Sequence, residues 1–394
     1  MDYDVAVVGA GPAGSLAARN CTERGLSTIL LEKGDFSSAK VCGGLLPACV
    51  LEEFNIPSKA ILRKLKGYRV YSPKDDIDEF IFEKKGATTN RDIFDSYLAR
   101  EAEKAGAELS LNSKVSNVDI GKKNAIITFQ KEAEKYKLSC NIVISADGVG
   151  SRITKKFLGN VYTKNKFAHL YQVTYPLVNE IDFFEVYVHD TISQGLGWIS
   201  PKDNVASLGI GVDPSQNAKD VFYTHLNARK SLLSEKINLD EELKVESAPL
   251  SYCNFLEKAY YDRLLVVGDA ALLTNPASGD GIYYAMKSGE FAANIATKSI
   301  EKGDFTEEIL KQYQNILESE FRDIFNYNLK VQRRFFRYPH RHEFLIKSKK
   351  KAHEFLDSYF WSKHINKVPL KHKIELELAY LALRGTELLT GRVK

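Results

Sequence analysis

The pattern of apolar positions predicts a strand, a turn, a helix and a second strand within the first 33 residues. The apolar run "YDVAVVG" (3–9) precedes "AGPAGSLAARNCTERG" (10–25), whose later part has helical periodicity, and "LSTILLEK" (26–33) is again strand-like. Strands that alternate with helices are typical of a parallel sheet covered by helices. The start of the chain therefore predicts a βαβ unit.

A further helix is predicted over "RDIFDSYLAREAEKAG" (91–106). Thr89 or Asn90 can cap its first turn, and Gly106 is a residue type that ends helices. Its buried face is predicted to contain Ile93, Tyr97 and Leu98. Strands are predicted to follow at 107–119, 123–130, 135–140 and 141–145.

From about residue 165 the pattern changes to alternating aromatic and β-branched residues. Segments such as "FFEVYVH" (183–189) and "VASLGIGV" (205–212) predict antiparallel strands. "RLLVVGDAA" (263–271) then predicts a return to a parallel strand, and a helix is expected to start near Gly281. The rest of the chain, to residue 394, is predicted to be helical.

The composition is that of a folded globular protein, with 394 residues, 44% hydrophobic and 27% charged. Five scattered cysteines contain no C-x-x-C pair and no Cys/His cluster, so neither a disulfide framework nor a metal site is predicted. No run of about 18 apolar residues occurs, and the chain goes directly from Met1 into the first strand without a secretory signal. A cytoplasmic protein is expected.

The first chemical motif is G-x-G-x-x-G, formed by Gly9, Gly11 and Gly14 with Ala13 inside it. Such glycines let backbone N–H groups approach a pyrophosphate at a helix N-terminus. Glu32, at the end of the next strand, is placed to bind a ribose hydroxyl pair and disfavours a ribose 2′-phosphate. The motif in this context predicts a dinucleotide, either FAD or NAD.

Two later segments resemble motifs of the p-hydroxybenzoate hydroxylase-like flavoproteins. "RLLVVGDAALLTNPASGDGI" (263–282) is similar to their second FAD motif, which implies that Asp269 contacts the ribityl chain. The same resemblance implies that Gly281 and Ile282 begin a helix whose N–H groups face the flavin. "ADGVGSR" (146–152) resembles their DG motif. Three signatures in this order indicate FAD.

Within that superfamily the sequence resembles the geranylgeranyl reductases. "KVCGGLLPACVLEEFNIP" (40–57) is similar to a segment of these enzymes, which implies that Cys42, Gly43 and Gly44 lie beside the flavin ring. Cys42 has two interpretations, as a proton donor or modulator of the flavin, or as a small residue that lets the loop pass the ring.

Two further segments carry the same resemblance. "NRDIFDSYLAREAEKAGAEL" (90–109) implies that Arg91 touches the cofactor, and the backbone near Val115 is implied to pass the adenine. "GWISPKDNVASLGIGV" (197–212) resembles the substrate motif, with Trp198 and Pro201 in register. Ser200 stands where the usual pattern has Phe, so the shape of the prenyl pocket differs there.

The pattern and the resemblance imply an α/β fold in three parts. A Rossmann-like FAD-binding domain is expected from 1–160 with 256–300, and an antiparallel β-sheet substrate domain from 161–255. Residues 301–394 are expected to form a helical C-terminal region. An apolar tunnel is expected in the second domain, lined by Phe183, Phe184, Tyr187, Trp198 and Ile210, although an ordinary core is an equally good interpretation of each of these residues.

The implied activity is FAD-dependent reduction of C=C bonds in geranylgeranyl chains, foremost those of archaeal-type membrane glycerophospholipids. Geranylgeranyl diphosphate and the chlorophyll side chain are alternative substrates. An aromatic monooxygenase of the same fold and a non-catalytic prenyl-lipid carrier remain open. The electron donor would be ferredoxin, a deazaflavin or NADPH.

The C-terminal part is strongly basic, although the whole chain has a net charge of only +4. Residues 330–394 contain 16 Lys and Arg against 6 Asp and Glu, and aromatic residues, Trp361 among them, are interleaved with the cations. This mixture suits the surface of an anionic membrane, and a solvated helical face is the equally weighted alternative. Nucleic acid is not expected as a partner.

Overall fold

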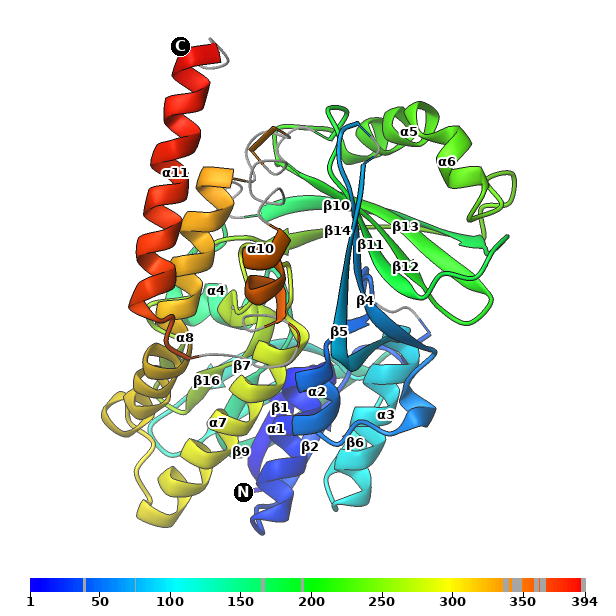
Figure 1. Cartoon of the computed structure of the whole chain (residues 1–394). Helices are drawn as coiled ribbons and strands as arrows, with labels where there is room; N and C mark the ends of the chain where they lie inside the picture. The colour runs from blue at the N-terminus through cyan, green and yellow to red at the C-terminus, as the bar shows by residue number, and fades with distance from the viewer. Residues whose placement is uncertain are drawn as a thin grey trace.

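The computed structural model describes residues 1–37, 40–74, 76–163, 167–192, 195–335, 340–341, 349–357, 361 and 366–390. Two β-sheets form the body, one in the lower and one in the upper half of Figure 1, and helices from the end of the chain lie beside both. Within these residues, no helix combines the length and apolarity needed to cross a bilayer.

The first sheet is Rossmann-like. The parallel neighbours of β1 (Tyr3–Val8) are β2 (Thr28–Leu31) and β9 (Glu134–Ser145). The parallel array is extended by β6 (Glu108–Ser110) and β16 (Leu264–Val266). Short antiparallel neighbours complete it, namely β7 (Lys114–Ile120), β8 (Ala125–Lys131) and β15 (Tyr260–Tyr261). The predicted return of the chain near residue 264 is confirmed.

Three helices pack together on the first sheet. The helix α1 (Pro12–Glu23) packs against α3 (Arg91–Lys104) and α7 (Ile282–Lys302). A Cβ at Gly289 of α7 would lie 2.2 Å from the carbonyl oxygen of Ala13, so only glycine allows this approach. The shorter helical segments here are α2 (Ala48–Glu53), η1 (Ser58–Ala60), α4 (Arg152–Leu158) and η3 (Gly268–Ala271).

Two local predictions differ from the structure. Ile93 of α3 is exposed, and the buried face of this helix instead contains Phe94 and Leu98. The strands predicted at 135–140 and 141–145 are one continuous strand, β9, whose first half pairs with β8 and whose second half pairs with β1.

The second sheet extends beyond residues 161–255, to which the sequence analysis confined it. Its order is β14 (Lys244–Ser251), β10 (Phe167–Pro176), β13 (Val205–Val212), β12 (Leu196–Pro201), β11 (Phe183–Tyr187), β4 (Arg63–Tyr71), β5 (Ile77–Thr88) and β3 (Leu45–Leu46). The sequence placed β3, β4 and β5 in the FAD-binding domain by position, whereas their hydrogen bonds belong to this sheet. The parallel β11–β4 pair makes the connection, between strands more than 100 residues apart.

The two faces of the second sheet have separate cores. The outer face packs under α5 (Ala218–Ala228) and α6 (Lys230–Ser234). The inner face, towards the first sheet, carries a second apolar cluster built around Tyr68, Phe80 and Phe82. Functional residues on this sheet must therefore lie on the inner face.

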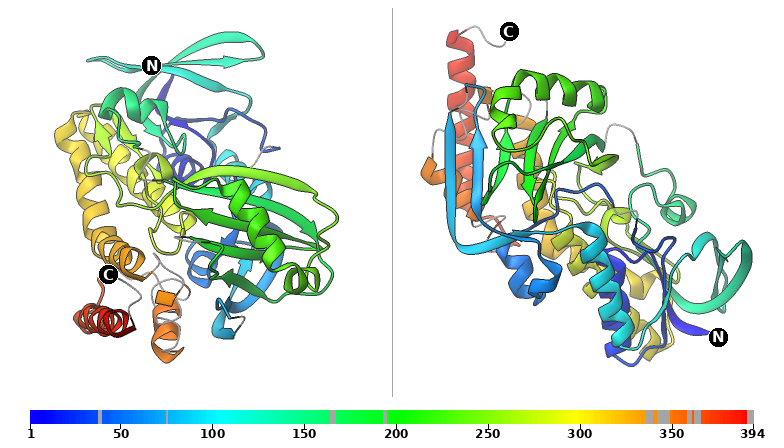
Figure 2. Two further views of the ribbon diagram at one scale, coloured as in Figure 1. Left: turned by 90° about the horizontal axis from the view of Figure 1, so that it is seen from above. Right: turned by 90° about the vertical axis from the view of Figure 1, so that its right-hand side faces the viewer.

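Most of the described residues beyond 306 are helical, as predicted for the end of the chain. The long helix α8 (Glu307–Phe335) packs on α7, and it is followed by α10 (Lys349–Leu356) and α11 (Leu370–Thr390). Both figures place α11 at the periphery, beside the C-terminal part of α8 (Figures 1 and 2).

Candidate active site

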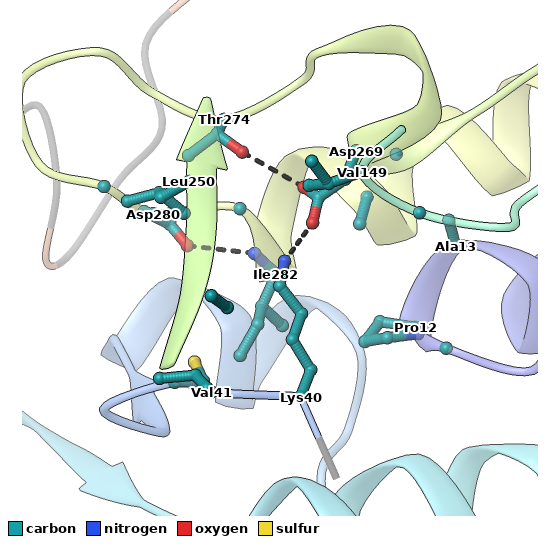
Figure 3. A pocket seen from close by; sticks show the side chains of 18 of the residues that line it. Pro12, Ala13, Lys40, Val41, Val149, Leu250, Asp269, Thr274, Asp280 and Ile282 are labelled. Atoms are coloured by element: carbon teal, nitrogen blue, oxygen red, sulfur yellow. Dashed lines mark hydrogen bonds and ion pairs between the residues drawn. The ribbon is translucent and has the colours of Figure 1, made fainter. Parts of the chain in front are cut away.

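A cavity of about 1170 Å³ connects the glycine motif of the first sheet with the inner face of the second. Figure 3 shows part of its wall, where residues from α1, the 40–46 loop and the start of α7 converge. Most of the predicted site residues line it: Gly9, Gly11, Ala13, Glu32, Cys42, Gly43, Gly44, Arg91, Val115, Trp198, Asp269, Gly281 and Ile282. Gly14 and Pro201 lie behind the lining.

The three glycines of the first motif have different roles. A Cβ at Gly9 (φ +101°) would lie 2.3 Å from the Ala146 carbonyl oxygen, and one at Gly14 would lie 1.9 Å from that of Gly9. These two glycines serve close packing. A Cβ at Gly11 would have its nearest neighbour, Nη2 of Arg91, at 3.9 Å. This glycine therefore leaves space in front of the first turn of α1. No side chain caps that turn, and its N–H groups can receive an anion.

Glu32 is held at the end of β2 with its carboxylate towards the glycine loop. Its Oε2 accepts a hydrogen bond from the Ala10 N–H at 2.7 Å, and its Oε1 accepts one from the Gly34 N–H at 3.1 Å. A carboxylate has about four acceptor positions, so it can accept ribose hydroxyls as well. The predicted role of Glu32 agrees with this placement.

Arg91 begins α3 and is buried together with Asp95. Its Nε and Nη2 donate to the two oxygens of Asp95 at 2.8 and 2.7 Å. Burial alone would lower the pKa of the guanidinium, but the Asp95 carboxylate raises it, so Arg91 stays charged. The guanidinium therefore offers a fixed positive charge beside Gly11.

Asp269 forms an ion pair with Lys40 across the cavity wall, which joins the two distant segments shown in Figure 3. The Thr274 hydroxyl also donates to its Oδ1 at 3.1 Å. Burial by itself would raise the pKa of Asp269, but Lys40 and Arg91 lower it below the usual range. The sequence contained no signal for Lys40 beyond its place two residues before Cys42.

Asp280 is a buried carboxyl group in the cavity wall, and the residue is only 9% exposed. Its Oδ1 accepts a hydrogen bond from the Ile282 N–H at 3.2 Å, at the start of α7 (Figure 3). Burial raises its pKa to about 7, although the N–H groups of Tyr283 and Ile282 act in the opposite direction. The sequence pointed to Gly281 and Ile282 but assigned no role to the acid that precedes them.

The 40–46 loop is fixed by contacts that explain its two glycines. Gly44 has φ +73°, and a Cβ there would lie 1.9 Å from the Thr89 carbonyl oxygen. Its N–H donates to the sulfur of Cys42 at 3.3 Å. The carbonyl of Gly43 accepts a hydrogen bond from Ser200, the residue that replaces the usual Phe. The loop is therefore held against β12 with the half-buried Cys42 in the cavity wall.

The far part of the cavity is apolar. It is lined by Tyr68, Val70, Phe80, Phe184, Val186, Val188, Leu196, Trp198 and Leu356. Of the five residues predicted for a tunnel, Phe184 and Trp198 line the cavity. Tyr187 and Ile210 lie in the core under α5, and Phe183 stacks against Arg69. Side chains alternate between the two faces of a strand, so neighbouring aromatic residues have different surroundings.

Trp361 closes this apolar region from behind instead of facing a membrane. Its ring centroid lies 5.1 Å from that of Tyr68 and 5.0 Å from that of Phe82, and its Nε1 donates to the Lys84 carbonyl at 2.5 Å. The side chain is fully buried. Trp361 is therefore not a membrane anchor. Parts of the basic aromatic stretch around it, namely 336–339, 342–348, 358–360 and 362–365, lie outside the described residues.

Comparison with known proteins agrees with a flavin site. Two models of the FAD binding domain match residues 76–319 and 4–54. The digeranylgeranylglycerophospholipid reductase of Methanocaldococcus jannaschii is 34% identical over 326 residues, which are 79% of this chain and 81% of that enzyme. A reductase of the same name from Methanopyrus kandleri is 31% identical over 337 residues, 82% of this chain and 88% of the relative. The chain belongs to the digeranylgeranylglycerophospholipid reductase family.

Solved structures share the fold of this reductase family member at lower identity. A geranylgeranyl bacteriochlorophyll reductase-like protein from Thermoplasma acidophilum superposes with a TM-score of 0.78 at 23% identity, covering 95% of both chains. A flavin-dependent brominase superposes with a TM-score of 0.75 at 16% identity, over 98% of this chain and 99% of its own. These likenesses establish the flavoprotein fold.

The cavity of this family member fits FAD, its cofactor. The open N-terminus of α1 around Gly11, with the charge of Arg91, would hold the pyrophosphate. Glu32 would hold the adenosine ribose, Asp269 the ribityl chain, and the start of α7 at Gly281 the flavin ring.

Proposed function

We propose that this protein reduces C=C bonds in the geranylgeranyl chains of archaeal-type membrane glycerophospholipids, with FAD as its cofactor. The observation that carries the proposal is the continuity of one cavity. Its near part has the polar groups that a flavin dinucleotide needs, and its far part has apolar walls suited to a prenyl chain. The names of the relatives support the choice of lipid.

A prenyl double bond is unactivated, so its reduction needs a hydride, a proton and a site without water. Reduced FAD supplies the hydride. The chain supplies the dry site, because Tyr68, Phe184 and Trp198 form an apolar wall that Trp361 and the β4–β5 strands close from behind. The 40–46 loop, whose Gly43 carbonyl accepts a hydrogen bond from Ser200, would hold the prenyl chain and the cofactor against each other.

The proton is assigned to Asp280. A general acid works best when its pKa lies near the operating pH, and burial raises the pKa of Asp280 to about 7. Its carboxyl group can therefore hold a proton near neutral pH. When that proton has been given to the alkene carbon, the carboxylate is stabilised by the N–H of Ile282 and takes up a new proton after the product has left the cavity. Cys42 keeps its second interpretation, that of a small residue in the wall.

The test is mass spectrometry of lipids after incubation with the chemically reduced holoenzyme under anaerobic conditions. We expect digeranylgeranylglycerophospholipid to gain the mass of two hydrogen atoms for each double bond reduced. Chemical reduction makes the outcome independent of whether ferredoxin, a deazaflavin or NADPH is the natural donor. Geranylgeranyl diphosphate and a chlorophyll with a geranylgeranyl side chain are the comparison substrates.

Several results would contradict the proposal. Reduction of the diphosphate or of the chlorophyll side chain in preference to the lipid would replace the substrate. Oxygen-dependent insertion of a hydroxyl group into an aromatic compound would replace the reaction. Tight binding of the lipid by a colourless protein without flavin absorbance would leave a non-catalytic prenyl-lipid carrier as the function.

A further inference from the structure

The outer face of α11 carries an unusual row of aliphatic side chains. The aliphatic stripe consists of Leu370, Ile374, Leu378, Leu381, Leu388 and Leu389. These side chains are between 50 and 90% exposed. At 3.6 residues per turn they fall within a sector of about 100° of the helix surface. A continuous apolar surface of this kind on a folded protein marks an interaction site.

The opposite face of α11 is firmly attached to the body, so the direction of the stripe is fixed. Leu376 and Leu383 are buried, and Glu387 is buried with hydrogen bonds from Arg341 at 2.6 and 3.0 Å. Burial would raise the pKa of Glu387, but hydrogen bonds led by that from Arg341 lower it to about 2, so the pair stays ionised.

Ion pairs at two other levels add to this attachment. Lys373 binds Asp323 of α8 at 2.6 Å, and Glu377 binds Arg334 of α8 at 2.7 Å. These pairs hold one flank of α11 along the length of α8. A rotation of the helix that buried the stripe would break them, so the aliphatic side chains stay turned to the outside.

The same helix forms part of the proposed substrate cavity. His372, Glu375, Leu376 and Ala379 line the cavity from α11, together with Leu356 from α10 and Val331 from α8. The stripe therefore belongs to a helix that borders the cavity. A surface that delivers a long-chain lipid would need to lie at this place.

We infer that α11 docks on the surface of an anionic lipid bilayer, with the aliphatic stripe inserted among the headgroups and upper acyl chains. Helices with one apolar and one polar face lie in the plane of a membrane surface in this way. Charge complementarity favours a lipid surface over a second copy of this chain, because residues 330–394 contain 16 Lys and Arg against 6 Asp and Glu. An interface between two copies would join two segments of the same net positive charge, whereas an anionic membrane neutralises such a charge.

Exposed lysines lie at the start of this helix. Lys367 precedes α11 by three residues, and Lys371 is in its first turn. Both can reach lipid phosphates while the stripe is inserted. The inference rests on the proposed function for its choice of a lipid-delivering surface, and it moves the membrane contact predicted for residues 330–394 away from Trp361.

The test is flotation of the FAD-loaded full-length protein with vesicles of phosphatidylcholine alone or mixed with phosphatidylglycerol. The stripe variant is Ile374→Ser/Leu378→Ser/Leu381→Ser. The matched control is Ile77→Ser/Val178→Ser/Val245→Ser, which removes three equally exposed aliphatic residues elsewhere. We expect the wild type and the control to float, better with phosphatidylglycerol, and the stripe variant to bind at least about tenfold more weakly.

Other outcomes would overturn the inference. The inference is overturned if the stripe variant floats as well as the wild type. It is also overturned if both variants lose flotation equally, or if the wild type does not float at all. Sedimentation velocity provides a further check, because a wild-type dimer that only the stripe substitutions convert to monomers, with flotation unchanged, would assign the stripe to a second copy.

Reduction of detergent-dispersed lipid by the same preparations separates this inference from the proposed function. Reduction without flotation contradicts the docking of α11 alone. Flotation without reduction of any prenyl lipid contradicts the proposed function and leaves the docking surface standing.

Discussion

Replacement of Asp280 by Asn removes an ionisable group from the cavity wall while keeping its size and its acceptor oxygen. Burial raises the pKa of Asp280 from 3.8 to about 7, a difference of about three units. One unit corresponds to about 1.4 kcal/mol, so the shift corresponds to about 4 kcal/mol. Asp280→Asn therefore changes both the stability of the protein and the availability of a proton.

The sign of the stability effect follows from proton binding. Between about pH 4 and pH 7 the folded protein holds a proton on Asp280 that the unfolded chain has lost, so stability decreases as the pH rises through this window. Above pH 7 the full penalty of about 4 kcal/mol is present. Asn cannot ionise, and we expect Asp280→Asn to raise the thermal midpoint of the apoprotein more at pH 8 than at pH 5.

The groups that face Asp280 do not titrate in the same range. They are Cys49 on α2, Tyr68 on β4 and Tyr284 on α7, and burial raises the pKa of each above its ordinary value. The control is Asp240→Asn, at an exposed carboxylate, which should leave the pH dependence of the midpoint unchanged. A difference between wild type and Asp280→Asn that is the same at both pH values would refute the assigned ionisation.

Activity provides the second measurement. A positioned general acid contributes about 10²- to 10⁴-fold, and we expect a loss of that size in single-turnover oxidation of the reduced holoenzyme by lipid at pH 6. The wild-type rate should fall as the pH rises through 7, and the residual rate of Asp280→Asn should not. FAD content checks that the site is intact. A variant with the wild-type rate and pH profile would remove Asp280 as the proton source.

Three further expectations concern the FAD site. Gly44→Ala places a Cβ 1.9 Å from a backbone carbonyl oxygen at φ +73°, so we expect loss of FAD and a stability loss of about 3 kcal/mol or more by thermal shift. Gly43→Ala should be milder, because its Cβ meets only the aromatic side chains of Phe184 at 3.3 Å and Trp198 at 3.6 Å. Arg91→Met leaves Asp95 buried without its partner and should cost about 3–5 kcal/mol. Adding Asp95→Asn should restore most of the stability but not FAD affinity in a flavin titration, and recovery of both would show that Arg91 has only a structural role. Cys42→Ser and Cys42→Ala should both reduce lipid at nearly the wild-type rate, and a loss of about 10²-fold in both would give the thiol a chemical role.

The amino-acid sequence alone was sufficient for the parts of the site that depend on local backbone chemistry. Position 9 needs glycine, because a Cβ there would lie 2.3 Å from the Ala146 carbonyl oxygen. The acid at the end of the next strand needs only the βαβ order to reach the loop. These demands are met by residues close together in the chain. The FAD segments are therefore recognisable from the order of the residues alone.

Only the tertiary structure decided which residues share a wall. Strand alternation shows that Phe183 and Phe184 point to opposite faces, but not which face borders the cavity. That depends on the pairing of β11 with β4, which no local pattern specifies. In the same way, burial raises the pKa of Asp280 to about 7. Packing places Trp361 inside the apolar cluster of the second sheet. The ion pairs between α11 and α8 leave the aliphatic stripe of α11 exposed. Burial and long-range pairing are properties of the packed chain, so the sequence supplied the residues and the packing selected their roles.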